Sequence, residues 1–337
     1  MKALKKRKLG NIEVSEIGMG CMGFSHGYGQ IPDEKYSIEA IRKAYEGGCT
    51  FFDTAEGYGA FLYSAGHNER LLGTAVKPFR DKAVLATKFH FMGNIPQGKG
   101  KIYSYVRSHL EQSLKNLQTD TVELYYLHRV NRAVPIETVA ECMGRLIDEG
   151  LIKGWGLSQV EVDTIAKAHE ITPVSAVQNL YNMLERDCER NVIPYCLEHN
   201  IGVVPFSPVA SGFLSGNINS ETDFSHSDDV RKFVPQLTPD NQNANRPFLD
   251  LIKSFANKKN ASNAQIAIAW MLHKYPSIVP IPGSKNSERI LENLGACNIS
   301  LSNEEFITLD KALSAITVHG HRGCVEFDGD SMKDWNR

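Results

Sequence analysis

The sequence contains no run of about 18 apolar residues, so we expect no membrane-spanning helix. Its basic N-terminus, residues 1–8, is followed by Leu9-Gly10-Asn11-Ile12-Glu13 and not by the apolar segment of a signal peptide. The formal net charge is only −2, which argues against a general affinity for nucleic acid or for an anionic membrane. We therefore interpret the basic cluster as a solvated terminus, with a nucleic-acid-binding arm as the alternative.

The sequence also lacks a cysteine framework. Its seven cysteines are odd in number and scattered, and no two of them form a C-x-x-C pair. We therefore expect neither disulfides nor a zinc site, predict no metal, and favour reduced thiols in the cytoplasm. The composition, 42% hydrophobic and 23% charged, is that of an ordinary globular protein. No shift in composition marks a second domain, so we treat residues 1–337 as one domain.

What the chain does contain is a regular alternation of two patterns. Short β-branched runs alternate with amphipathic helical patterns of 10 to 15 residues, after a predicted hairpin within residues 5–17. The predicted strands lie at residues 16–19, 50–52, 83–88, 122–128, 152–158, 174–178, 201–206 and 277–281. Eight such units predict an α/β fold, a closed (β/α)8 TIM barrel with an N-terminal β-hairpin and extra C-terminal helices or loops.

Two segments fall outside this alternation. Residues 211–247 are rich in Ser, Asn, Asp and Gly, which is typical of a lid or binding loop, although a floppy insertion is the alternative. Residues 318–337 form a tail that we expect on the surface.

A glycine pattern suggests a competing fold. Gly18, Gly20 and Gly23 match the G-x-G-x-x-G fingerprint of a Rossmann dehydrogenase, with Asp53 as the ribose-binding acid. The third glycine should open a helix, but the chain continues as a loop until Asp33, which is a good helix cap. We therefore prefer the barrel.

In such a barrel the active site is built at the carboxyl ends of the strands. These ends carry Asp53, Lys88 and His128, and a Gly-bracketed turn presents Tyr58 just beyond Asp53. A lysine ammonium next to a phenol favours the phenolate, so we expect a lowered pKa for Tyr58, while an Asp beside the lysine keeps it charged. A histidine can polarise a carbonyl oxygen. Together, the four groups could protonate an alkoxide as hydride reaches a carbonyl carbon.

The motifs around these residues resemble those of the aldo-keto reductase family, and the similarity runs over about residues 9–312. They are Phe-Asp-Thr-Ala-Glu-x-Tyr, Ala-Thr-Lys and Leu-His-Arg, in this order at successive strand ends. The resemblance implies that Asp53, Tyr58, Lys88 and His128 form the catalytic tetrad, with Tyr58 as general acid. It also implies reduction of a small aldehyde or ketone.

The resemblance further implies an NADP(H) site. The nicotinamide end would involve Ser158, Gln178 and Phe206, and Phe206 replaces the family's usual Tyr. Gln159 likewise stands where many members have Asn. The predicted contacts of the pyrophosphate and the adenosine are Ser207, Pro208, Ser211, Gly212, Leu214, Gly283, Ser284, Lys285, Arg289, Glu292 and Asn293. Ser284, Lys285 and Arg289 offer a hydroxyl and two cations for a 2′-phosphate, which favours NADPH over NADH.

Substrate-pocket candidates are assigned by position only. They are Met22, Phe24, Phe89, His90 and Arg129. The sequence leaves the physiological substrate and the oligomeric state open. An alternative function is that of a cofactor-binding regulatory subunit, because potassium-channel β subunits resemble the same family.

Overall fold

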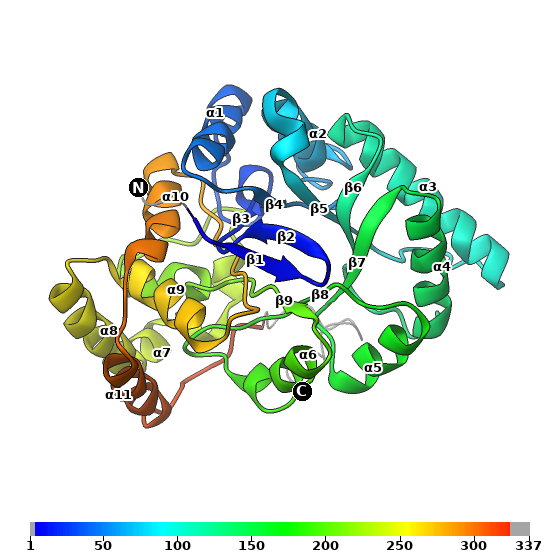
Figure 1. Ribbon diagram of the computed structural model, residues 1–337. Coiled ribbons are helices and arrows are strands. Elements are labelled where there is room, and N and C mark those ends of the chain that lie inside the picture. Colours follow the sequence, from blue (N-terminus) through cyan, green and yellow to red (C-terminus); the bar gives the residue numbers. More distant parts are fainter. Residues whose placement is uncertain (1–3, 324–337) are drawn as a thin grey trace.

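The computed structural model describes residues 4–323. Seven parallel strands form one curved sheet in which each strand pairs with the next along the chain, and helices surround it (Figure 1). The strands are β3 (Met19–Gly20), β4 (Phe51–Asp53), β5 (Val84–Phe89), β6 (Val122–Leu127), β7 (Ile152–Ser158), β8 (Ala176–Gln178) and β9 (Gly202–Val203). The predicted barrel fold is confirmed.

The predicted eighth strand is an extended segment that makes only isolated bridges. Val203 pairs with Ile278 and Gly20 with Gly283, both in parallel, so residues 278–283 lie between β9 and β3. The N–H groups of Gly18 and Gly20 donate to the carbonyls of Pro280 and Pro282 at 2.9 and 3.4 Å. Because proline has no N–H, it can accept but not donate in a ladder, which interrupts the strand.

The glycine pattern serves this closure of the barrel and not a dinucleotide loop. A Cβ at Gly18 would lie 2.5 Å from a ring carbon of Phe51, and one at Gly20 would lie 3.0 Å from the carbonyl of Ile281. After Gly20 comes a three-residue 3₁₀ helix (Met22–Phe24), and the first α-helix begins only at Glu34. The Rossmann alternative is therefore wrong.

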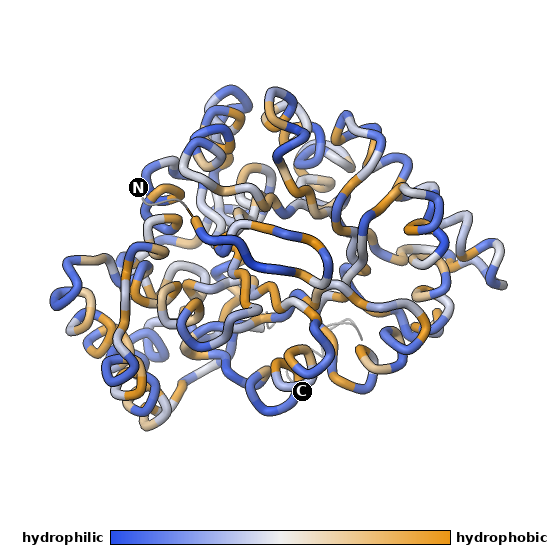
Figure 2. The backbone as a smooth tube through the Cα atoms, viewed as in Figure 1, coloured by the Kyte–Doolittle hydropathy of each residue, from blue (hydrophilic) through white to orange (hydrophobic). Residues whose placement is uncertain are grey.

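Most helices around the sheet are amphipathic, and hydrophobic and hydrophilic residues alternate along them (Figure 2), whereas the helix at Asn263–Lys274 is buried over most of its length. Asp33 caps the first, accepting a hydrogen bond from the N–H of Tyr36 at 2.9 Å, as predicted. The helices are α1 (Glu34–Glu46), α2 (His67–Val76), α3 (Lys99–Leu117), α4 (Ile136–Asp148), α5 (Val162–Ile171), α6 (Val192–Glu198), α9 (Asn263–Lys274), α10 (Ser287–Leu294) and α11 (Asn303–Ser314).

The predicted hairpin is present and covers the amino end of the barrel. Strands β1 (Lys6–Leu9) and β2 (Ile12–Ser15) pair antiparallel and lie across the barrel in Figure 1. Leu9, Ile12 and Val14 belong to the same apolar cluster as the side chains that fill the barrel interior. Arg7 is not part of a solvated terminus, because its guanidinium donates to the carbonyls of Leu272, Tyr275 and Ile278 at 2.6 to 2.7 Å.

Residues 211–247 are more ordered than a floppy insertion. They include 3₁₀ helices (Ala210–Ser215, Val230–Phe233, Pro235–Leu237) and α7 (Pro239–Ala244), and they lead into α8 (Arg246–Lys259), a helix that the sequence analysis missed. The first part of the tail packs on them: the carbonyls of His319 and His321 accept from Asn245 Nδ2 at 2.8 Å and from the N–H of Gln236 at 3.2 Å. The tail residues 324–337 lie outside the described residues.

No helix among residues 4–323 is long and apolar enough to cross a membrane. Buried free thiols occur at Cys21, Cys49, Cys142 and Cys196.

Candidate active site

The four predicted tetrad residues converge at the carboxyl ends of β4, β5 and β6. Lys88 is fully buried; its ammonium donates to Asp53 Oδ1, to the carbonyl of Thr54 at 2.7 Å and to Tyr58 Oη at 3.3 Å. The other oxygen of Asp53 accepts from Gln178 Nε2 at 2.8 Å. The lysine is thus held between a carboxylate and a phenol, and the carboxylate is itself fixed by β8.

Electrostatics keep the lysine charged and the phenol protonated. Burial alone disfavours the ammonium, but Asp53 and Tyr58 raise the pKa of Lys88 above its ordinary value. Burial also raises the pKa of Tyr58, and Lys88 opposes this only in part. The expectation of a lowered pKa for Tyr58 is therefore wrong as a net effect, because desolvation of the phenolate outweighs the attraction of the lysine.

His128 faces Tyr58 edge-on, with ring centroids 5.7 Å apart and planes at 82°. Its other neighbour is the ring of His90, 4.2 Å away. Burial and the nearby cations Arg129 and Lys88 hold the pKa of His128 well below its ordinary value, so the imidazole is neutral. Its Nδ1 is buried and has no hydrogen-bond partner within residues 4–323.

Glu56, in the turn that carries Tyr58, supports this arrangement from outside the cavity. Its Oε1 accepts from the N–H of His90 at 2.9 Å, and its Oε2 lies 2.7 Å from His109 Nδ1. Glu56 therefore fixes the backbone of His90, whose ring packs against that of His128. Sequence reasoning assigned it no role, because its partners come from the following strand end and from α3.

A cavity of about 480 Å³ extends from the tetrad. Asp53, Tyr58 and His128 line one part of it. Nearly all predicted cofactor residues also line it: Ser158, Gln178, Phe206, Ser207, Pro208, Ser211, Gly212, Gly283, Ser284, Lys285, Arg289, Glu292 and Asn293. Leu214 does not, since its side chain is fully buried in the hydrophobic core.

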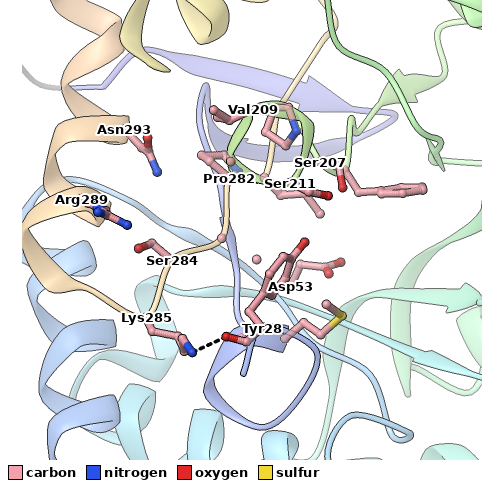
Figure 3. A pocket seen from close by; sticks show the side chains of 18 of the residues that line it. Tyr28, Asp53, Ser207, Val209, Ser211, Pro282, Ser284, Lys285, Arg289 and Asn293 are labelled. Carbon is pink, nitrogen blue, oxygen red and sulfur yellow. Dashed lines mark hydrogen bonds between the residues drawn. The ribbon is translucent and has the colours of Figure 1, made fainter. Parts of the chain in front are cut away.

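Figure 3 shows the part of this cavity beside α10, where Ser284, Lys285, Arg289 and Asn293 lie together. Asn286 caps α10 by accepting from the N–H of Arg289 at 2.9 Å. Lys285 Nζ donates to the carbonyls of Tyr28 and Gln30, both at 2.6 Å. Burial and the nearby Arg231 lower the pKa of Lys285. The arrangement offers a hydroxyl and cations beside a helix N-terminus, which suits an anion.

Of the predicted substrate-pocket residues, Met22 and Arg129 line the cavity. Arg129 donates to Ser158 Oγ at 2.9 Å, and burial lowers the pKa of Arg129 to about 10.

Three others do not line it. Phe89 follows Lys88 in β5, so its side chain points to the opposite face and stacks on Tyr125 in the core. Phe24 is also core, and His90 lies against His128.

The cavity also contains residues that the sequence analysis did not assign. They are Gly20, Gly23, Tyr28, Val209, Ser215, Asn217, Arg231, Ala264, Ile281, Pro282, Asn286 and Arg322. Several belong to the loop after β9 or to the tail, whose paths no periodicity predicts. In the part of the chain that the structure describes, no group of three His, Cys, Asp or Glu residues could hold a metal ion.

The fold and the polar rim together have the organisation of barrel enzymes, which place their sites at the carboxyl ends of the strands. The sequence profile described as Aldo/keto reductase family matches residues 16–314. The chain belongs to this family.

Individual relatives agree. A protein named Probable aldo-keto reductase 1 from Glycine max is 38% identical over 320 residues, which are 94% of this chain and 90% of that protein. The solved glycerol dehydrogenase from Gluconobacter oxydans superposes with a TM-score of 0.82 at 25% identity, covering 94% of this chain and 97% of that one. An aldo/keto reductase from Klebsiella pneumoniae, solved with NADP and acetate, gives 0.72 at 26% identity, covering 96% and 100%.

Proposed function

We propose that this protein is an NADP(H)-dependent oxidoreductase that reduces an aldehyde or ketone to an alcohol, with Tyr58 as the proton donor. The observation that carries the proposal is the buried Lys88, ion-paired with Asp53 and hydrogen-bonded to the Tyr58 phenol at the wall of a cavity. Membership of the family and the NADP bound in the Klebsiella relative support it.

The residues present fit NADP(H). The cavity extends from the tetrad to Ser284, Lys285 and Arg289, which could hold a 2′-phosphate. At the tetrad end, Phe206 offers an aromatic face and Gln178 and Ser158 offer polar groups to a nicotinamide. The bound cofactor would supply the hydride.

The side chains of this chain would then handle the carbonyl oxygen. Neutral His128 can donate one hydrogen bond to it and so orient it beside Tyr58. Tyr58, protonated in the resting site, would release its proton to the developing alkoxide. Lys88 would stabilise the phenolate left behind, while Asp53 keeps Lys88 charged. The tetrad thus provides an acid, Tyr58, whose phenolate form would be stabilised by contact with the Lys88 ammonium.

Tyr58→Phe tests the proton donor. We expect turnover in NADPH oxidation, measured across aromatic, aliphatic and sugar aldehydes, to fall by about 10²- to 10⁴-fold, the usual range for a general acid. NADPH binding should stay within error, because the ring remains in place. Unchanged turnover would remove Tyr58 from this role. Wild-type protein that binds NADPH but reduces no carbonyl would instead favour a regulatory cofactor-binding subunit.

Lys285→Ala combined with Arg289→Ala tests the placement of the 2′-phosphate. Loss of two cations should weaken NADPH binding by about 10²- to 10⁴-fold and leave NADH binding nearly unchanged, since charge-assisted hydrogen bonds contribute about 1.5–3 kcal/mol each. Fluorescence titration with both cofactors measures this. Lys285→Ala alone also removes the hydrogen bonds to the carbonyls of Tyr28 and Gln30, so its effect would combine the loss of a cation with a change in that loop. Arg289→Ala alone is therefore the better single variant for comparison. An unaltered preference would mean that the phosphate binds elsewhere.

A further inference from the structure

Arg322 brings a buried cation into the cavity from the tail. Its side chain lines the cavity, only 7% of the residue is exposed, and its Nε is buried without a hydrogen-bond partner in the described part of the chain. Glu185 is the carboxylate near it: the charge of Arg322 opposes the rise that burial causes in the pKa of Glu185, but within residues 4–323 no ion pair forms between the two side chains. Such a group is costly to bury unless something pairs with it.

Apart from Arg289, which is exposed, the other cations of the cavity differ in this respect. The guanidinium of Arg231 forms two hydrogen bonds with Asp229, at 2.9 and 2.5 Å. Lys285 is bonded to two carbonyls and Arg129 to a hydroxyl. The cavity's own carboxylates are also engaged, Asp53 by Lys88 and Glu292 by Ser262 at 2.6 Å. Neither is available to Arg322.

The position of Arg322 is set by its backbone and not by its side chain. Its N–H donates to Glu185 Oε1 at 2.7 Å, and Gln236 Nε2 donates to the same oxygen at 2.7 Å. The N–H of Glu185 in turn is bonded to Asn182 Oδ1, and Asn182 Nδ2 donates to the carbonyl of Ser207 at 3.0 Å. Arg322 is thus tied to the loops after β8 and β9.

We propose that Arg322 binds an oxyanion of the cavity's ligand, because a guanidinium matches phosphate and carboxylate groups with paired hydrogen bonds. Two sources share this chemistry: the pyrophosphate of the dinucleotide, or an acidic group on the carbonyl substrate. An acidic group on the substrate is relevant only if the proposed carbonyl reduction is correct, so this choice rests on the proposed function. Binding of the pyrophosphate can be measured whether or not the protein turns over a substrate. In either case the bound anion would accept the hydrogen bond of the buried Nε, which has no acceptor among the described residues.

The test compares Arg322→Gln with Arg322→Lys in the full-length protein. Arg246→Gln is the matched control, since that arginine is well exposed and lies outside the cavity. Calorimetry measures the binding of NADP+, and then the binding of 4-(hydroxymethyl)benzoate and of its uncharged methyl ester to the NADP+-loaded protein. These binding measurements do not depend on catalysis, so a protein without turnover still reports on Arg322.

Loss of a charge-assisted contact corresponds to about 10- to 100-fold in affinity. If the cofactor is the source, Arg322→Gln weakens NADP+ by that factor. If the substrate is the source, NADP+ binding is retained and only the benzoate is lost, with the ester unchanged. Arg322→Lys should recover part of either loss, which a merely structural role of the side chain would not predict. Wild-type affinity for NADP+ and an unchanged benzoate-to-ester ratio in a folded Arg322→Gln would overturn the proposal. Should Arg322→Gln not fold, wild-type affinities for all three ligands in Arg322→Lys would also overturn it, because a lysine cannot reproduce paired hydrogen bonds.

Discussion

Arginine side chains at the two ends of the barrel differ in their hydrogen bonding. At the amino end, Arg7 belongs to the hairpin and donates to three main-chain carbonyls. The apolar side chains of the same hairpin join the barrel interior. At the carboxyl end, Arg322 reaches the cavity with its Nε unpaired among the described residues. The same side chain therefore completes the fold at one end and stays available for a ligand at the other.

The contrast extends to other polar groups. His128 Nδ1 and Ser211 Oγ at the carboxyl end are also buried without a partner in the described part of the chain, although the Ser277 hydroxyl near the amino end is too. Unsatisfied polar atoms cost about 1–3 kcal/mol each. The unpaired atoms of Arg322, His128 and Ser211 differ from that of Ser277 because these three residues line the cavity, where a ligand can pair with them.

The largest expected effect comes from breaking the buried ion pair of the site. Lys88→Met leaves the Asp53 carboxylate buried and uncompensated, so we expect the free energy of unfolding to fall by about 3–5 kcal/mol, together with loss of activity. Urea denaturation at neutral pH measures the first and NADPH oxidation the second.

The double variant Asp53→Asn/Lys88→Met separates the two losses. Removing both charges should restore most of the stability, because no buried charge is left unpaired, while activity stays low. Restored activity in the double variant would show that Lys88 does not act on Tyr58. A double variant as unstable as Lys88→Met would show that the charge pair is not the cause of the loss.

Periodicity predicted the barrel and the strand ends that carry Asp53, Lys88 and His128, whereas Tyr58 was predicted from the turn after Asp53 and from the family resemblance. Strands and helices alternate along the chain, and parallel strands bring their carboxyl ends to one rim. Successive side chains of a strand point to opposite faces, so the placement of Lys88 in the tetrad already implies that Phe89 points away from it. Phe89 should therefore not have been predicted as a substrate-pocket residue. Arg322 and Arg231 could not be found this way, because they belong to segments whose course is set by tertiary contacts. Likewise, no pattern shows that Arg7 reaches the end of α9.

Removal of Arg7 gives a smaller effect, confined to stability. Arg7→Met leaves three carbonyl acceptors without their donor, so we expect a loss of about 2–3 kcal/mol in the free energy of unfolding. The kcat/KM for a good aldehyde should not change, since the residue lies at the opposite end of the barrel from the cavity. Arg7→Lys, which keeps the charge but cannot reach all three carbonyls, should fall in between. A large change in kcat/KM with unaltered stability would contradict the view that Arg7 at the amino end serves the fold while Arg322 at the carboxyl end serves a ligand.

The smallest expected effect is a pH dependence that arises at the carboxyl end. Burial, Arg129 and Lys88 lower the pKa of His90 to about 4, below the 6.5 of an ordinary histidine. Between these values the unfolded chain binds more protons than the folded one, so stability rises with pH and is lost as the pH falls through this window. Because His90 is only partly buried, we expect its share to be about 1–2 kcal/mol between pH 7 and pH 5. His90→Asn should remove that share in urea denaturation at the two pH values and leave the part that comes from His128, whose pKa is lowered as well. An equal pH dependence in His90→Asn and wild type would mean that His90 is protonated equally in the folded and unfolded chains.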